Sequence, residues 1–353
     1  MKKILYTATV FSHIKLFHQP FMKLMREKGY EVYVACDTKG TFDDLSINYC
    51  DKLIDVCFPR NPFSLKTFKA YKEIKSIIDN NHFDIIHCNS PTASILTRIA
   101  ARKQKNTKVI YMAHGFHFFK GAPLINWLLF YPVEYICSYF TDILVTINDE
   151  DYQNAMKMHA KKVFKINGVG IDLDKYSNVE REYDKDSLYL LSVGELNSNK
   201  NHKIVIDAIK NRDDLDYHIC GKGSLDGSLK ELAHNNCVNL VLEGFQTNIK
   251  EFLDKADIFI FPSLREGLPK SVMEAMACGL PCIVSNVRGN RDLIDDGKGG
   301  FVVENNENEY LEAINKLKND PMLRKQMGEY NINKIKNYSI DSILEQMEKI
   351  YES

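Results

Sequence analysis

The stretch "EGLPKSVMEAMACGLP" at 266–281 places two carboxylates, Glu266 and Glu274, eight positions apart among apolar neighbours. Pro269 is a favourable first residue for a helix, and Gly279 is a typical residue to end one. Backbone N–H groups at the start of a helix lack intrahelical partners and can bind an anion. Here these groups would be the amides of Leu268, Lys270 and Ser271.

The spacing of these groups suits the parts of a nucleotide-sugar. Glu274 would lie about 7–8 Å along the helix from Pro269, and its carboxylate can accept two hydrogen bonds from a vicinal diol such as a ribose. With a diphosphate on the helix amides, Glu266 would lie beside the sugar. The alternative is that Glu274 pairs with Lys270 one turn earlier and that Glu266 is a solvated loop charge. Taken alone, the stretch favours this alternative.

Strands and helices are expected to alternate along the 353 residues, because short β-branched or aromatic runs are separated by longer amphipathic ones. This alternation predicts parallel sheets with right-handed crossovers, and therefore an α/β fold of two Rossmann-like domains. The predicted strands are 3–8, 31–37, 53–58, 84–89, 108–113, 142–147, 189–194, 216–220, 239–243, 257–262 and 281–285. The clearest helical segments are 66–79, 92–104, 201–211, 226–235 and 269–278.

The alternation breaks between about 167 and 187, where the chain is polar, charged and contains glycine. We therefore expect four parts. They are an N-terminal domain over 1–168, a linker over 169–187, a second domain over 188–335 and a C-terminal helix over 336–353, which Ser339 can cap.

Residues able to do chemistry gather where the predicted strands end. Ligands of parallel α/β sheets bind beyond the carboxyl ends of the strands. Two sheets that face each other would bring these loops together in one interdomain cleft. The candidates are His13 and His18 after the first strand, His114 after the fifth, and Gly194, Lys200, Gly244, Phe245 and Gly267 in the second half.

The stretch from Glu266 resembles the Glu-x7-Glu signature of retaining glycosyltransferases of family 4, which have the GT-B fold. The resemblance covers most of the chain. "GELNSNKNH" (194–202) is similar to the family's phosphate-binding loop, "AHGF" (113–116) to its sugar-facing histidine loop, and "INGVGIDLDKY" (166–176) to its hinge segment. The chain also resembles the bacterial branch that builds capsules, O-antigens and other surface polysaccharides.

The resemblance implies a role for each matching residue. Glu266 would contact hydroxyls of the donor sugar, Glu274 the ribose, Lys200 the diphosphate, and His114 the transferred sugar near its 6-position. The N-terminal domain, with His13 and His18, would take the acceptor.

Three departures from the family pattern stand out. Glu195 occupies the position where the family commonly has arginine, so Lys200 and the helix amides must do more, or Arg265 or Arg291 substitutes. "RGNRDL" (288–293) replaces a common glycine-glycine-x-proline-glutamate run. The glycine pair expected after the first strand is also missing.

The resemblance further implies a reaction. A hexose or N-acetylhexosamine would pass from a UDP-sugar to a polyprenyl-diphosphate-linked glycan or an oligosaccharide, with retention at the anomeric carbon. The leaving phosphate would take the acceptor proton, and no metal, other cofactor or nucleic-acid partner is expected. Two alternatives stay open: a GT-B UDP-sugar epimerase, and a non-catalytic partner subunit that keeps the fold.

Composition gives weaker indications about environment. Nine cysteines, an odd number without metal-ligand spacing, favour reduced thiols and a cytoplasmic protein. The apolar stretch 122–140 contains Asn126, Pro132 and Glu134, which argues against a membrane-spanning helix. The net charge of −1 hides an asymmetry: residues 1–168 hold 23 Lys and Arg against 15 Asp and Glu, a balance of +8, and the remainder has a balance of −9.

The basic first half favours an anionic partner, and segment 60–78 is the candidate contact. Lysines recur in it at three-residue spacing beside Phe63, Phe68 and Tyr71, with Glu73 the only acid among them. We expect Phe68 and Ile78 to pack on the sheet. The lysines would dock the protein peripherally on the anionic inner face of the cell membrane. They are Lys66, Lys69, Lys72 and Lys75.

Overall fold

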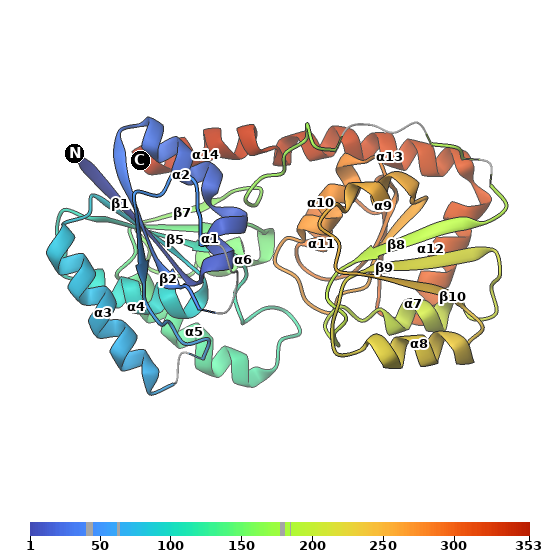
Figure 1. Ribbon diagram of the computed structural model, residues 1–353, viewed down its shortest axis with the longest axis horizontal. Helices are drawn as coiled ribbons and strands as arrows, with labels where there is room; N and C mark the ends of the chain where they lie inside the picture. Colours follow the sequence, from blue (N-terminus) through green and yellow to red (C-terminus); the bar gives the residue numbers. More distant parts are fainter. Residues whose placement is uncertain (40–44, 62–63, 177–180, 184) are drawn as a thin grey trace. The chain divides into compact units, whose positions relative to one another are not determined.

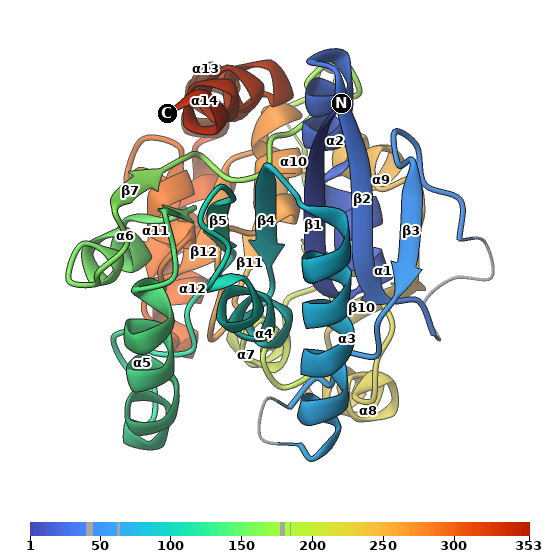
Figure 2. The ribbon, with the colours of Figure 1, turned by 90° about the vertical axis from the view of Figure 1, so that its left-hand side faces the viewer.

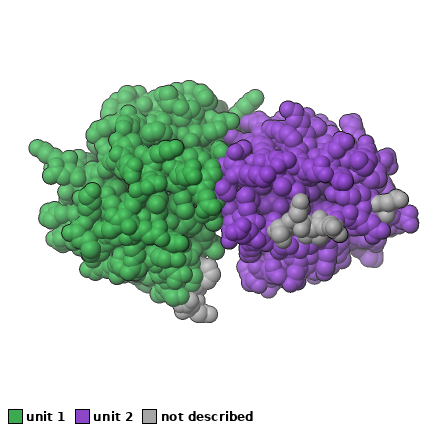
Figure 3. All heavy atoms as spheres, turned by 90° about the horizontal axis from the view of Figure 1, so that it is seen from above, with its two compact units in different colours: residues 1–170, 340–353 green, residues 171–339 purple. Residues whose placement is uncertain are grey.

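The chain forms two compact units in the computed structural model, which describes residues 1–39, 45–61, 64–176, 181–183 and 185–353. The first unit comprises Met1–Gly170 together with Ile340–Ser353, and the second comprises Ile171–Ser339 (Figure 3). Phe63 and Asp184 lie outside the described residues.

The first unit is built on a seven-stranded sheet in the order β3-β2-β1-β4-β5-β6-β7, with every described strand pair parallel (Figure 1). Its strands are β1 (Lys2–Val10), β2 (Tyr30–Asp37), β3 (Lys52–Asp55), β4 (Ile85–Asn89), β5 (Lys108–Ala113), β6 (Ile143–Thr146) and β7 (Lys162–Lys165). Its helices are α1 (Phe11–Phe17), α2 (Gln19–Glu27), α3 (Lys66–Asn81), α4 (Pro91–Ala101), α5 (Leu124–Ser138), α6 (Asp149–Ala155) and α14 (Ile340–Glu352).

The second unit is built on a six-stranded sheet in the order β10-β9-β8-β11-β12-β13, again with parallel pairs among the described residues. Its strands are β8 (Leu188–Val193), β9 (Leu215–Cys220), β10 (Asn239–Gly244), β11 (Ile258–Phe261), β12 (Cys282–Ser285) and β13 (Gly300–Val303). Its helices are α7 (Lys203–Ala208), α8 (Asp226–Asn235), α9 (Lys250–Lys255), α10 (Lys270–Ala277), α11 (Asn290–Leu293), α12 (Glu307–Asn319), α13 (Pro321–Ile335) and the 3-10 turn η1 (Lys336–Tyr338).

Both faces of each sheet are buried, as strands with few polar residues require. On β11, Ile258 and Ile260 pack into one core, and Phe259 and Phe261 into the core on the opposite face, because successive side chains of a strand alternate. In the first unit, α3, α4 and α5 lie side by side on one face of the sheet (Figure 2). The predicted α/β class with two Rossmann-like parallel sheets is confirmed.

All eleven predicted strands are present, with ends that differ by up to three residues. Two strands escaped prediction. β7 is short and begins and ends with lysine, and β13 is a four-residue strand that starts at Gly300. The segment after the first strand, expected as a loop, forms α1 and α2.

The C-terminal helix α14 belongs to the first unit, not to the domain that precedes it in sequence. Tyr351 explains this placement: its hydroxyl lies 2.7 Å from Nδ1 of His87 on β4 and 3.0 Å from the hydroxyl of Tyr6 on β1. Lys28 after α2 also pairs with Glu348 and Glu352. Because α14 carries four acids and one lysine, the first unit holds 24 Lys and Arg against 19 Asp and Glu, a balance of +5 instead of +8.

Described parts of the predicted linker 169–187 pack on the second unit. Ile171 forms a β-bridge with Ser339, and Tyr176 is buried. Arg181 donates hydrogen bonds to the backbone carbonyls of Leu253 and Cys278 at 2.9 Å. A guanidinium has five N–H donors, so one arginine can hold a polar segment against several carbonyls.

The apolar stretch at 122–140 contains α5, one side of which is anchored by a buried ion pair. Glu134 on α5 accepts from Arg98 on α4 at 2.6 Å, and the guanidinium of Arg98 lies 4.1 Å from the centre of the Tyr111 ring. None of the helices in the described residues has the length and apolarity to cross a membrane. All nine cysteines lie in the described residues and are free thiols, as expected.

Candidate functional site

The loops after β8, β9 and β10 in the second unit are joined by backbone hydrogen bonds. Gly194 N–H donates to the Cys220 carbonyl at 3.0 Å, and Gly221 N–H donates to the Gly244 carbonyl at 2.8 Å. A Cβ on Gly221 would lie 1.8 Å from the Gly194 oxygen, so no other residue fits there without a shift of the backbone. The predicted site residues Gly194 and Gly244 therefore meet at one edge of the sheet.

Lys200 and Glu266 form an ion pair in this loop cluster. The ammonium lies 2.6 Å from Oε1 of Glu266, and the two side chains are only 20% and 13% exposed. The same ammonium lies 4.6 Å from the centre of the Phe261 ring, and the Leu264 N–H donates to the Asn199 carbonyl at 2.8 Å, which joins the two loops. The residues assigned by resemblance to diphosphate and sugar are thus in direct contact.

The α10 helix begins one residue later than predicted. Pro269 is its N-cap, in extended conformation and buried, and Lys270 is the first helical residue. The first amides of an α-helix have no intrahelical acceptor. The start of α10 therefore has the backbone geometry on which the predicted anion site depends, and the neighbouring Gly267 and Leu268 are partly exposed.

Glu274 is 8% exposed and has a partner that the sequence analysis missed. The Tyr176 hydroxyl donates to Oε1 of Glu274 at 2.6 Å, while Lys270 lies 3.9 Å from the same oxygen. Burial, followed by the contact with Glu274, raises the pKa of Tyr176 above its usual value. Tyr176 is the last residue of the hinge-like stretch "INGVGIDLDKY". Its position in this motif is the feature of the sequence that could have identified it as a site residue.

Arg288 is a second residue that the sequence analysis missed. It is buried, and its Nε donates to the backbone carbonyl of Glu266 at 3.0 Å. The two arginines suggested as substitutes for the missing family arginine are both exposed: Arg291 donates to Asn286 at 3.3 Å, and Arg265 lies in the loop before Glu266. Glu195 is exposed and accepts from the Asn197 side chain at 2.9 Å.

Phe245, predicted with Gly244 at the nucleotide-sugar site, is 69% exposed after β10. Gly244 adopts a φ of +71°, a conformation that favours glycine.

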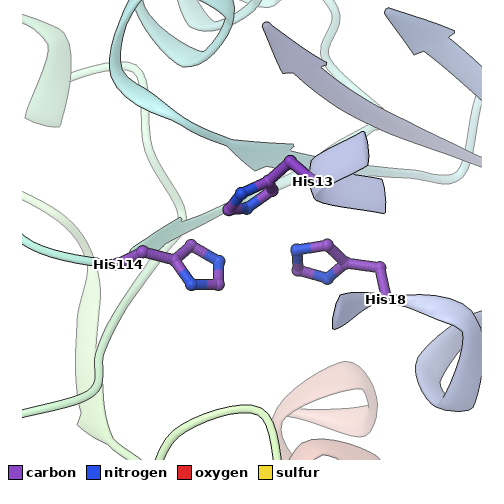
Figure 4. Close-up of side chains that lie close together, drawn as sticks. All are labelled: His13, His18 and His114. Atoms are coloured by element: carbon purple, nitrogen blue, oxygen red, sulfur yellow. The ribbon is translucent and has the colours of Figure 1, made fainter. Parts of the chain in front are cut away.

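His13, His18 and His114 of the first unit lie together (Figure 4). His13 comes from α1, His18 from the junction of α1 and α2, and His114 follows β5. Ring centroids are 4.4 Å apart for His13 and His114, and 5.3 Å apart for His18 and His114. Burial lowers the pKa of His13 to about 4 and holds the pKa values of His18 and His114 well below their usual range, so all three are neutral at pH 7.

The surface of α3 differs from the prediction in two respects. Ile78 is buried as expected, but Phe68 is 65% exposed, with the Lys72 ammonium 4.5 Å from its ring centre. The prediction failed because the sheet side of α3 is taken by Ala70, Ile74 and Ile78, at four-residue spacing. Glu73 is also not the only acid within reach, since Lys75 pairs with Asp79 at 2.6 Å.

Two known family models together match most of the chain. Residues 175–334 match the family described as glycosyl transferases group 1, and residues 3–148 match the family described as glycosyl transferase 4-like. The chain is 34% identical to a protein named as glycosyltransferase EpsD of Bacillus subtilis, over 99% of this chain and 96% of that protein.

A second relative is the UDP-Gal:alpha-D-GlcNAc-diphosphoundecaprenol alpha-1,3-galactosyltransferase of Escherichia coli, 28% identical over 85% of this chain and 83% of that protein. Among solved structures, Anabaena HepE in complex with UDP-glucose superposes with a TM-score of 0.79 over the full length of both chains, at 16% identity. Sucrose-phosphate synthase of Thermosynechococcus elongatus superposes with a TM-score of 0.80, over 100% of this chain and 98% of that one, also at 16% identity. These two structures support the fold.

The close approach at Gly221 generates a stability prediction. Gly221→Ala should destabilise the second unit by about 1–3 kcal/mol, as overpacking does. For a domain of this size each kcal/mol lowers the melting temperature by about 2–4 °C. The control is Gly227→Ala on α8, where an added Cβ meets nothing within 4 Å, and which should be neutral or stabilising by up to about 1 kcal/mol. Equal melting temperatures for the two variants would contradict the described loop contact.

Proposed function

Because the chain belongs to glycosyltransferase family 4, in the branch that builds bacterial surface polysaccharides, we propose that it transfers a hexose or N-acetylhexosamine from a UDP-sugar, with retention of anomeric configuration. The observation that carries the proposal is the arrangement around α10. Within one unit, a paired lysine and glutamate, a free helix start and a buried carboxylate follow each other in the order of a nucleotide-sugar.

The donor would use these groups in sequence. The ribose hydroxyls would donate to Glu274, whose orientation Tyr176 fixes from the other side. The diphosphate would accept from the amides at the start of α10. The sugar hydroxyls would donate to Glu266, and His114 would contact the transferred sugar, as the family pattern implies.

Lys200 would change partners when the donor binds. In the structure its charge is balanced by Glu266. An incoming diphosphate carries more negative charge than one carboxylate and competes for the ammonium, which releases Glu266 for the sugar hydroxyls. The ion pair therefore keeps both side chains in place without leaving a partly buried charge unpaired.

The reaction requires that negative charge on the departing UDP be stabilised. Lys200 and the α10 amides are fixed where that charge would develop, and preorganised donors of this kind are an efficient source of catalysis. We propose that the leaving phosphate takes the proton of the acceptor hydroxyl on the same face of the sugar. In this mechanism the protein supplies no covalent nucleophile, and transfer needs no metal ion.

We propose a polyprenyl-diphosphate-linked glycan as the acceptor, with His13 and His18 on the acceptor side. The name of the Escherichia coli relative supports this choice, since it specifies a diphosphoundecaprenol substrate. Such an acceptor would hold the protein at the cytoplasmic face of the membrane.

The proposed membrane contact combines α3 with α5. Lys66, Lys69 and Lys72 are exposed on α3. The outward side of α5 is apolar, an arrangement that suits insertion at a lipid interface. Its exposed large hydrophobic residues are Leu124, Ile125, Leu128, Leu129 and Ile136.

The nucleotide assignment is tested by two variants. Glu274→Gln should weaken UDP binding by about 10–150-fold, because hydrogen bonds to a charged group contribute roughly 1.5–3 kcal/mol. Glu266→Ala should abolish most turnover but leave UDP affinity unchanged or tighter, since Lys200 loses its carboxylate partner. Titration calorimetry with UDP and an assay of acceptor-dependent UDP release measure the two effects. An equal loss of UDP affinity in both variants would show that ribose and sugar are misplaced.

The electrostatic role of Lys200 is tested in the same assay. Lys200→Ala should reduce acceptor-dependent UDP release at least about 100-fold, the scale seen when one preorganised donor is removed. Lys203→Ala is the matched control, because Lys203 is exposed at the start of α7. EDTA should leave the wild-type protein active. Loss of activity with the chelator and its recovery with magnesium or manganese would refute the metal-free mechanism.

Membrane docking is tested by sedimentation with anionic liposomes. Binding should weaken as salt rises, since each lysine near an anionic surface contributes about 1 kcal/mol. Changing Lys66, Lys69, Lys72 and Lys75 to glutamine should abolish binding without affecting transfer to a short soluble acceptor. The control is the same change at four exposed lysines of the second unit, Lys230, Lys255, Lys316 and Lys325. If the α3 variant sediments like the wild type, α3 is not the contact.

A further inference from the structure

The three histidines His13, His18 and His114 bring ligand atoms close together. One ring nitrogen from each imidazole lies within 4.8 Å of those of the other two, and the side chains point toward one another from three different segments (Figure 4). His18 is fully buried, while His13 and His114 are partly exposed. The cluster is therefore closed to solvent at His18 and partly open to solvent at His13 and His114.

Ring nitrogens in this cluster are buried without hydrogen bonds. Over the described residues, no group partners either nitrogen of His18 or Nε2 of His13. An imidazole always carries at least one N–H, and leaving a buried polar group unsatisfied costs about 1–3 kcal/mol. A histidine that served only packing would be expected to have at least one partner. These nitrogens are therefore available to bind a ligand.

The chemistry of the cluster selects the class of ligand. The three donor atoms are all imidazole nitrogens, with no carboxylate or thiol among them, so the cluster suits a cation that prefers nitrogen ligands. Magnesium and calcium prefer oxygen ligands, whereas zinc and its neighbours bind imidazole well. We propose that His13, His18 and His114 form a binding site for a divalent transition-metal ion, with zinc the best match.

Coordination requires only a local contraction of the cluster. Zinc–nitrogen bonds of about 2.0–2.1 Å place tetrahedral ligand atoms about 3.3 Å apart, so the imidazoles must approach one another by rotation of their side chains. Asn89 supplies an outer contact, because its Oδ1 lies 3.4 Å from Nε2 of His114. Such a contact orients a ligating histidine and leaves Nδ1 for the metal. Three protein ligands leave one position for water or another oxygen ligand.

The groups proposed to stabilise UDP, Lys200 and the α10 amides, belong to the second unit, whereas the three histidines belong to the first. A bound ion would compete with the donor sugar for His114, a consequence that rests on the proposed function. Metal binding itself does not, because it can be measured without donor or acceptor. A negative result for zinc binding would therefore not contradict the proposed function, and a negative result for UDP binding would not contradict the zinc site.

The experiment uses the full-length protein stripped of metal and titrated with Zn²⁺ in competition with a chromophoric chelator. The wild type should bind one Zn²⁺ per chain and should not bind Mg²⁺ at this site. His13→Asn and His114→Gln should each weaken zinc binding at least about 100-fold, the upper end of the effect of changing an outer-shell contact. His234→Asn, an exposed residue on α8, is the control and should bind like the wild type.

A second measurement needs no variant that could misfold. Zinc should protect His13 and His114 of the wild-type protein from modification by diethylpyrocarbonate, with His234 modified at the same rate in both conditions, as read by mass spectrometry. The proposal is overturned if the wild type shows no saturable zinc binding, if folded His13→Asn and His114→Gln bind zinc as the wild type does, or if zinc protects neither histidine.

Discussion

The parallel direction of the strands is the constraint on which the rest of this structure depends. In both sheets every described strand pair is parallel, so all strands of a sheet deliver their carboxyl ends to one edge. In the second unit this brings the loops after β8, β9 and β10 into backbone contact, and Gly221 lets two of them approach more closely than a side chain would permit. Lys200 and Glu266 are consequently positioned by backbone hydrogen bonds as well as by their own ion pair.

The charged side chains at the candidate donor site have partners within the protein itself. Glu266 faces Lys200, and Glu274 has Tyr176 on one side and Lys270 on the other. A buried or half-buried charge without a partner is costly, so a ligand-free protein needs such contacts to keep its binding groups in place. In the proposed mechanism, parts of a nucleotide-sugar would replace these partners.

The two units differ in their chemistry. The second presents carboxylates, a lysine and helix amides, which are groups that recognise hydroxyls and phosphates. The first presents imidazoles beyond the ends of its strands, and one face of its sheet carries the basic helix α3 and the apolar helix α5, with α4 between them. Its net positive charge is smaller than that of residues 1–168 alone, because α14 also belongs to this unit and contributes four acidic residues.

Local pattern determined much of this protein. Alternating apolar runs predicted eleven of the thirteen strands, because burial on both faces leaves a signal that does not depend on distant residues. The family resemblance, added to the spacing of the motifs, selected Glu266, Glu274 and Lys200 as candidates, and the structure brings two of them, Lys200 and Glu266, into contact. The position of α10 followed from its flanking Pro269 and Gly279.

Only the tertiary structure decided the contacts between segments remote in sequence. Tyr176 pairs with Glu274, and Arg288 donates to the backbone carbonyl of Glu266. Phe68 is exposed, and α14 belongs to the first unit. The tertiary structure also assembled three histidines from α1, the α1–α2 junction and the loop after β5. Such contacts depend on which face of each element is already occupied, as Ala70, Ile74 and Ile78 occupy that of α3. That is a property of packing in three dimensions, which no local pattern of residues contains.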